Sequence, residues 1–371
     1  MGANDRIGGY QVIKPLGQGG MADVYLATYR GPAGFERRVA LKVLDQERSQ
    51  DAEACALFTD EARLAGMLHH KNIAQVLEVA REAGRHYLAM EYIDGVDLCG
   101  LLDACARRNV MPSYEVALAI VAQVAEGLDH AHRRCDANGR PLQLVHRDVS
   151  LSNIMVSHAG NVKVLDFGIA QSTLSSVPNV PGIVRGKAGY MSPEQCVGDP
   201  VDRRTDVFAL GIVLYELTTG ARCFVGNSDF DTMIAIARGT YTRPCELVAD
   251  YPVALERVVM KALAPTVEQR YQSCAELIDA IEGVMRGYGW LGGSAAIERA
   301  MRELFSDESA APELEAATVR EPAPPPMTAS LDVPRLARGS VAHLPWYVDE
   351  EEAMTRGRRP LSRWAAPQIA A

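Results

Sequence analysis

The chain has 371 residues and a net charge of −9, and its side chains are 48% hydrophobic and 23% charged. That length is enough for two or three domains or for one large two-lobed domain with a tail, and the hydrophobic fraction supplies a sizeable core. The acidic balance argues against a general nucleic-acid-binding protein, which would be basic.

Cysteine usage and apolar runs bear on the location of the protein. The eight cysteines are scattered singly, without a CxxC pair or a His/Cys cluster, so no zinc site is expected. Single cysteines are typical of reduced thiols in a cytosolic protein. The N-terminal MGANDRIGGY has no apolar core for a secretory signal, and the longest apolar run, VFALGIVLYEL, is too short to span a bilayer. We therefore expect a cytoplasmic protein without membrane insertion.

The first quarter of the chain predicts a small sheet with one helix. YQVIKPL, VYLATY and RRVALKVL, within residues 10–44, are strand-like and are separated by turns with Gly and Pro. Residues 51–69 have helical periodicity, with one apolar face formed by Phe58, Ala62, Ala65 and Leu68. VLEVAREAGRHYLAMEYI, residues 76–93, predicts two further strands around a Glu-Ala-Gly turn.

From residue 98 to about residue 285 the pattern is mainly helical, as in LCGLLDACA, VALAIVAQVAEGLDHAH and FALGIVLYELTTG. Short β-rich pieces, LVHRD, NIMVS and VKVLDFG, lie between the helices. A β-rich lobe followed by a helical lobe predicts a cleft between them, where ligands commonly bind. One more amphipathic helix is expected within 284–305, and the Ala/Pro/Glu-rich residues 306–371 are expected to form a disordered tail.

Two weak motifs lie in the predicted sheet. LGQGGMADVY, residues 16–25, is glycine-rich, and glycines let a backbone approach phosphate oxygens, although an ordinary hairpin turn fits this motif alone equally well. VALK ends an apolar strand at Lys42, whose stem could stay packed while its ammonium reaches a phosphate. Glu61 on the following helix could pair with that ammonium, although each charge taken alone would be an ordinary solvated one.

A stronger pair of motifs follows in the helical half. HRDVSLSN places Asp148 five residues before Asn153, and DFG begins thirteen residues later at Asp166. Asn153 and Asp166 supply hard oxygen ligands of the kind that Mg²⁺ prefers. Asp148 is placed to act as a base for a substrate hydroxyl or to orient it.

GYMSPEQ, DVFALG and PTVEQRY then follow in order between residues 189 and 271. This ordered set resembles the protein kinase family, and most of all the bacterial serine/threonine kinases of the eukaryotic (Hanks) type. The resemblance implies an α+β, two-lobed kinase fold over 10–283, preceded by a leader at 1–9. Its N-lobe would cover about 10–90, its hinge 91–97 and its C-lobe about 98–283.

The resemblance also implies roles for single residues around ATP. The glycine-rich loop would cover the nucleotide through Leu16, Gly17, Gln18, Gly19, Gly20, Met21, Ala22, Asp23 and Val24. Val24 and Ala40 would lie above the adenine, and Met155 below it. The gatekeeper, the hinge and the ribose contact would be Met90, Glu91 to Ile93, and Asp97, in that order.

The catalytic roles follow in the same way. Lys42 would contact the α- and β-phosphates and pair with Glu61, Asp148 would be the catalytic base, and Mg²⁺ or Mn²⁺ would bind Asn153 and Asp166. A second set would be structural: Glu194 and Arg270 as a buried ion pair, and Asp206 as the support of the catalytic loop. The implied reaction is transfer of the γ-phosphoryl group of Mg·ATP to Ser or Thr hydroxyls of protein substrates, including autophosphorylation.

The sequence departs from the family pattern at two places. Ala22 stands at the third glycine position, a mild change because alanine is also small. The catalytic-loop lysine is missing, and Ser150 takes its place, while Lys187 stands where such kinases have a threonine before the SPE motif. We hypothesise an exchange, in which Lys187 supplies the displaced cation. The alternative is that Lys187 points to solvent and Ser150 marks a slow kinase or a pseudokinase that acts as a nucleotide-binding scaffold.

The regulatory features are sparse. Residues 177–189 contain no Ser, Thr or Tyr, and the only hydroxyls between DFG and this stretch are Ser172, Thr173, Ser175 and Ser176. Activity is therefore expected not to depend on a phosphate at the family's usual position, where Arg147 would receive it. In the tail, LPWYV at 344–348 is a candidate docking motif for a partner, and Ser362 follows basic residues suited to a kinase, although short patterns of both kinds also arise by chance.

Overall fold

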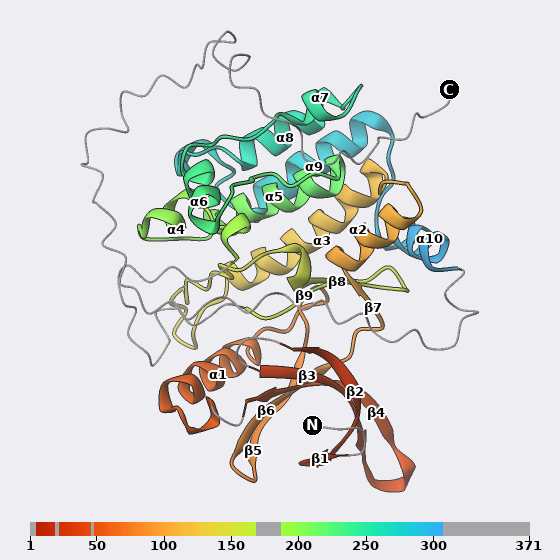
Figure 1. The fold of residues 1–371 in the computed structure, drawn as a ribbon, viewed down its shortest axis with the longest axis vertical. Helices are drawn as coiled ribbons and strands as arrows, with labels where there is room; N and C mark the ends of the chain where they lie inside the picture. The colour runs from red at the N-terminus through yellow and green to blue at the C-terminus, as the bar shows by residue number, and fades with distance from the viewer. Residues whose placement is uncertain (1–4, 19–21, 46–47, 168–186, 307–371) are drawn as a thin grey trace.

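The computed structural model describes residues 5–18, 22–45, 48–167 and 187–306. Figure 1 shows a β-rich N-terminal lobe with one long helix beside its sheet, and a larger helical lobe joined to it through a short connection. Several predictions fall outside the described residues: those for Gly19, Gly20 and Met21, for the loop hydroxyls at 172–176, and for the C-terminal tail.

The N-terminal lobe is built on a six-stranded antiparallel sheet with strand order β1-β2-β3-β4-β6-β5. The strands are β1 (Arg6–Ile7), β2 (Tyr10–Gln18), β3 (Ala22–Arg30), β4 (Glu36–Leu44), β5 (Val76–Glu82) and β6 (Arg85–Glu91). Helix α1 (Ala52–Ala65) begins at Asp51, whose carboxylate accepts a hydrogen bond from the backbone N–H of Glu53. This N-cap satisfies a donor that the first turn leaves free. The helix ends at Ala65, four residues before the predicted end.

The C-terminal lobe contains a three-stranded sheet of β7 (Gly95–Asp97), β8 (Ile154–Ser157) and β9 (Val162–Val164). Its helices are α2 (Leu98–Arg107), α3 (Tyr114–His132), α4 (Pro193–Val197), α5 (Arg204–Thr219), α6 (Asp229–Ala237), α7 (Pro244–Leu247), α8 (Val253–Ala262), α9 (Cys274–Tyr288) and α10 (Ser294–Phe305). Helix α5 lies at the centre, packed against α3, α8 and α9. Nearly all of its residues are buried, most of them apolar but including Asp206 and Glu216.

The prediction of a β-rich segment at LVHRD, residues 144–148, is wrong. LVHRD forms no strand in the structure, and β9 ends at Val164, before DFG. The backbone N–H groups of His146 and Arg147 donate to the side chain of Asp206 instead of to a neighbouring strand. A carboxylate about sixty residues further along the chain therefore takes the place of a strand partner.

The last two helices extend the lobe. Helix α9 continues to Tyr288, five residues beyond the predicted domain end at 283. Helix α10 packs against α2 and α3 and buries Ile297, Met301 and Phe305. Gly160 has a φ of +76°, and a Cβ there would lie 2.2 Å from the carbonyl oxygen of Ser294, so the β8–β9 turn approaches α10 closely because it carries glycine.

Over the ranges given above, no helix combines the length and the apolar character that crossing a membrane would take.

Candidate active site

The loop at 146–153 is held from below by one buried carboxylate. Asp206, in the first turn of α5, is fully buried and accepts hydrogen bonds from the backbone N–H groups of His146 and Arg147, each at 2.8 Å. His132 at the end of α3 binds the same carboxylate at 2.7 Å. Burial alone would raise the pKa of Asp206, but these partners hold it below its ordinary value. The charged carboxylate therefore fixes the loop, including Arg147, whose φ of +66° is uncommon for a residue other than glycine.

Asp148 and Asn153 face each other across this loop. The side-chain nitrogen of Asn153 donates to the backbone oxygen and to the Oδ2 atom of Asp148, both at 2.8 Å. A 3₁₀ turn at Leu151–Asn153 closes the five-residue spacing and brings the two side chains together. Because the amide nitrogen is used on Asp148, the amide oxygen of Asn153 is the atom left to bind a cation.

Lys42 links three separate segments of the chain. Its ammonium on β4 lies 2.8 Å from Glu61 on α1 and 3.2 Å from Asp166, which follows β9. Burial alone would lower the pKa of Lys42, but the Asp166 and Glu61 carboxylates outweigh it and raise the pKa above its ordinary value. Asp166 has a φ of +40°, an uncommon conformation that its ion pair with Lys42 helps to hold. The ammonium is therefore charged and fixed between two carboxyl groups, of which Glu61 has its pKa raised by burial.

The other predicted nucleotide residues within the described ranges lie on the strands around this centre. Val24 on β3 pairs with Lys42, and Ala40 on β4 pairs with Met90 on β6. Leu16, Gly17, Gln18, Ala22 and Asp23 lie on β2 and β3, and Ile93 lies in the β6–β7 connection. Met155 on β8 pairs with Asp97 on β7, whose carboxylate also caps α2 by accepting from the backbone N–H of Gly100 at 2.7 Å.

Sequence reasoning missed a contact of the hinge. The side chain of Glu91 accepts hydrogen bonds from Lys163 on β9 at 2.6 Å and from the backbone N–H of Gln75 at 2.8 Å. The pair therefore joins the end of the N-lobe sheet to the C-lobe sheet. Lys163 lies 72 residues after Glu91, on a short strand, and belongs to no motif, so the sequence does not signal the contact.

Ser150 and Lys187 meet through a third residue, Ser152, which the sequence did not single out. The ammonium of Lys187 donates to the hydroxyl of Ser152, and the Ser152 and Ser150 hydroxyl oxygens are 3.3 Å apart. The backbone N–H of Lys187 also makes a long contact of 3.4 Å with the Asp148 carboxylate. Ser150 is fully buried. The amine thus lies against the catalytic loop, at a residue two positions after the one from which the lysine is missing.

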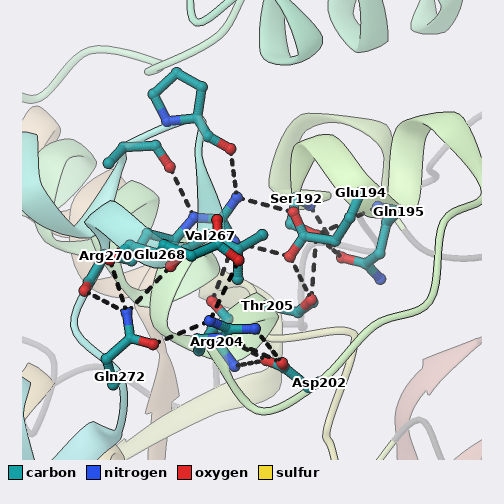
Figure 2. A network of polar contacts seen from close by, with 12 residues as sticks. Ser192, Glu194, Gln195, Asp202, Arg204, Thr205, Val267, Glu268, Arg270 and Gln272 are labelled. Carbon is teal, nitrogen blue, oxygen red and sulfur yellow. Dashed lines mark hydrogen bonds and ion pairs between the residues drawn. The ribbon is translucent and has the colours of Figure 1, made fainter. Parts of the chain in front are cut away.

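A second polar network supports the site from the helical lobe (Figure 2). Arg270 is almost fully buried and forms a two-pronged ion pair with Glu194, with both N···O distances at 2.8 Å. Thr205 donates to the same carboxylate at 2.7 Å, a contact that no motif predicted. Burial alone would raise the pKa of Glu194, but the bonds from Arg270 and Thr205 hold it below its ordinary value.

The donor set fits a magnesium ion that shares its ligands with a nucleotide. Within the part of the chain that the structure describes, no group of three or more His, Cys, Asp or Glu side chains could hold a metal on its own. Mg²⁺ is commonly bound by one or two carboxylates together with substrate phosphates. Asp166 supplies one carboxylate and Asn153 an amide oxygen, so they fit the ion only in company with phosphate.

Comparison with known proteins identifies the family. Residues 10–281 match the protein kinase domain family. The chain is 39% identical over 290 residues to the tyrosine-protein kinase MasK of Myxococcus xanthus, covering 78% of this chain and 45% of that protein. It is 33% identical over 270 residues to the serine/threonine-protein kinase PrkC of Bacillus subtilis, covering 73% of this chain and 39% of that protein. The chain thus spans less than half the length of these relatives.

A solved structure is also similar. The crystal structure of the PknI kinase domain from Mycobacterium tuberculosis has a TM-score of 0.56 and 29% sequence identity, and covers 76% of this chain and 98% of that one. The predicted two-lobed fold and the predicted resemblance to bacterial kinases of the eukaryotic type are therefore confirmed. From its motifs, its fold and these relatives, we conclude that the chain belongs to the protein kinase family.

Proposed function

We propose that this protein transfers the γ-phosphoryl group of ATP to Ser or Thr hydroxyls of protein substrates, including its own. The observation that carries the proposal is Lys42 held between Glu61 and Asp166, beside the Asp148–Asn153 pair. Phosphoryl transfer needs mainly positioning and neutralisation of charge. A fixed ammonium, a base and two oxygen donors for a metal are the groups that this task requires.

Each residue then has a distinct task. Lys42 would bind the α- and β-phosphates and orient them. Asp148 would accept the proton of the attacking hydroxyl, while its hydrogen bonds from Asn153 keep the carboxylate in place. Mg²⁺ or Mn²⁺, held by Asn153 and Asp166, would neutralise negative charge on the phosphate oxygens.

Lys187 would supply the cation that Ser150 cannot. Its contact with Ser152 supports this role, because the ammonium then lies on the catalytic loop rather than in bulk solvent. A preorganised cation stabilises the negative charge that develops on the transferred group. The pseudokinase alternative rests on the missing lysine alone, and it would lose that support if Lys187 supplies the cation.

The class of hydroxyl has a second candidate. The relative with 39% identity is named a tyrosine-protein kinase, whereas PrkC is named a serine/threonine-protein kinase. Tyrosine as an acceptor is therefore a specific alternative to Ser and Thr in this chain.

An autophosphorylation assay with γ-labelled ATP tests the proposal. Wild type should become labelled with Mg²⁺ or Mn²⁺, mainly on Ser and Thr, as phosphoamino-acid analysis would show. Asp148→Asn is the matched control, because it keeps the shape of the side chain and removes the base. Label on tyrosine alone would favour the second candidate. Nucleotide binding without any labelling, with either metal, would identify a scaffold.

Replacing Glu61 with Gln should lower kcat/KM by about 10- to 100-fold. The change removes one of the two carboxylates that hold the Lys42 ammonium, and a hydrogen bond to a charged group contributes about 1.5–3 kcal/mol. Steady-state kinetics with a protein substrate would measure the loss. Glu126→Gln is the matched control, because Glu126 pairs with the exposed Lys71 on the surface. An equal loss in both variants would contradict the role of Glu61.

Activity should survive removal of the four hydroxyls at residues 172–176. A variant with alanine at Ser172, Thr173, Ser175 and Ser176 is expected to keep the turnover of wild type, since the family's usual phosphate position carries no hydroxyl here. Turnover and phosphopeptide mapping of the active protein would measure this. An inactive variant would show that one of the four hydroxyls is required.

A further inference from the structure

A cavity of about 200 Å³ lies beside the catalytic loop, between α2, the end of α5 and the connection before α3. Its walls are mostly apolar, with Leu102 and Ala106 from α2, Met111 from the connection, and Leu151 from the catalytic loop. A cavity of roughly 150 Å³ is enough to hold a benzene ring. This one can therefore accept one aromatic or branched aliphatic side chain.

The cavity adjoins the reacting groups. Leu151 is three residues from Asp148 in the chain, and Tyr190 is three residues from Lys187, whose backbone N–H contacts Asp148. Tyr190 in turn donates to Glu216 in the cavity wall at 2.6 Å. A polypeptide that presents a hydroxyl to Asp148 would therefore lie close to this cavity.

The one buried carboxylate in the cavity wall, that of Glu216, already accepts hydrogen bonds from groups of the protein. Glu216 accepts hydrogen bonds from Tyr190, from Arg222 at 3.2 Å and from the backbone N–H of Cys223 at 3.3 Å. Its side chain is only 4% exposed, whereas that of Arg222 is 62% exposed. The guanidinium of Arg222 also lies 5.3 Å from the centre of the Tyr190 ring, which fixes it above Glu216. Arg222 thus covers the acid and presents a positive charge at the rim.

Asp103 is the other acidic residue in the lining; it lies on α2 and is exposed.

We propose that this cavity receives an apolar side chain of the protein substrate, close to the acceptor hydroxyl, and that Arg222 excludes Lys and Arg from it. The proposal rests on the proposed kinase function. An apolar side chain gains from the walls formed by Leu102, Met111 and Leu151, while a cationic one meets the Arg222 guanidinium and finds Glu216 occupied. Discrimination of this kind combines an attractive and a repulsive element.

Peptides that carry Leu or Arg at one position near the acceptor hydroxyl test the proposal. At the position that reaches the cavity, wild type should prefer Leu by at least about tenfold in kcat/KM. Arg222→Ala exposes the Glu216 carboxylate, so the ratio should move toward Arg by about tenfold or more. The double variant Glu216→Gln/Arg222→Ala removes that carboxylate and should not gain the preference for Arg.

Controls separate specificity from folding and from turnover. Arg243→Ala breaks a similar Arg–Glu pair, with Glu256 at 2.9 Å, and should keep the wild-type ratio. If Arg222→Ala does not fold, Arg222→Gln replaces it; this variant retains a donor for Glu216 but removes the positive charge, so the preference for Leu over Arg should weaken. Peptide affinity, measured by fluorescence anisotropy with a non-hydrolysable nucleotide, reads the preference without turnover. A wild-type preference for Arg, an unchanged ratio in Arg222→Ala, or a gain of Arg preference in the double variant overturns the proposal. Intact preference without transfer overturns only the kinase function.

Discussion

Lys187→Met is expected to lower kcat by about 10²- to 10³-fold and to leave nucleotide affinity close to that of wild type. Methionine keeps much of the length of the lysine side chain and removes its ammonium. Within residues 187–192, that ammonium is the one charged group that contacts Ser152. The effect should fall on kcat because the cation would act on charge that develops during transfer rather than on the bound nucleotide. Single-turnover kinetics and nucleotide titration would separate the two quantities.

Two further comparisons sharpen this test. Lys71→Met removes a surface lysine paired with Glu126 and should leave kcat unchanged. Lys187→Thr should be as slow as Lys187→Met, and the double variant Ser150→Lys/Lys187→Thr, which restores the arrangement usual in the family, should recover at least tenfold of that loss. Unchanged turnover in Lys187→Met would show that Lys187 is not the replacement cation.

The sequence was sufficient for the residues whose spacing is local. Asp148 and Asn153 lie five apart, and one 3₁₀ turn brings them together, so their pairing could be anticipated from HRDVSLSN. Lys42 and Glu61 are far apart in the chain, and their predicted pairing is present in the structure. The ion pair of Lys42 with Asp166 was not predicted.

Contacts between segments that belong to no motif could not be predicted in this way. Ser152 became visible as the link between Ser150 and Lys187 only when both segments were placed in space. The same is true of Glu91 with Lys163. LVHRD has the composition of a strand, yet its backbone donors are satisfied by a distant carboxylate, a tertiary effect that overrides local propensity.

Arg270→Met should lower the free energy of unfolding by about 3–5 kcal/mol. The substitution leaves the Glu194 carboxylate in a buried position with Thr205 as its remaining side-chain donor. It also removes the donors that Arg270 provides to the backbone oxygens of Ala264 and Pro265, at 2.7 and 3.0 Å. Urea denaturation without nucleotide would measure the loss. Arg286→Met breaks the exposed pair with Glu282 and should cost less than about 1 kcal/mol.

The cause of this loss can be tested by pH. In wild type the pKa of Glu194 lies below its ordinary 4.5, so the ion pair stabilises the fold above that value and this contribution is lost as pH falls through the lowered pKa. In Arg270→Met, burial without the cation should raise the pKa of Glu194. Once the acid is protonated, no uncompensated charge remains buried, so the variant is less destabilised relative to wild type. The difference in the free energy of unfolding between the two proteins should therefore shrink as pH falls from 7 toward about 5.

The double variant Glu194→Leu/Arg270→Met gives a second test of the same cause. It removes the buried charge altogether and should recover part of the lost stability. The Arg270 guanidinium also lies over the Phe208 ring, 4.8 Å from its centre. If the difference in stability stays constant with pH and the double variant recovers nothing, the destabilisation comes from lost packing against Phe208 and not from an uncompensated carboxylate.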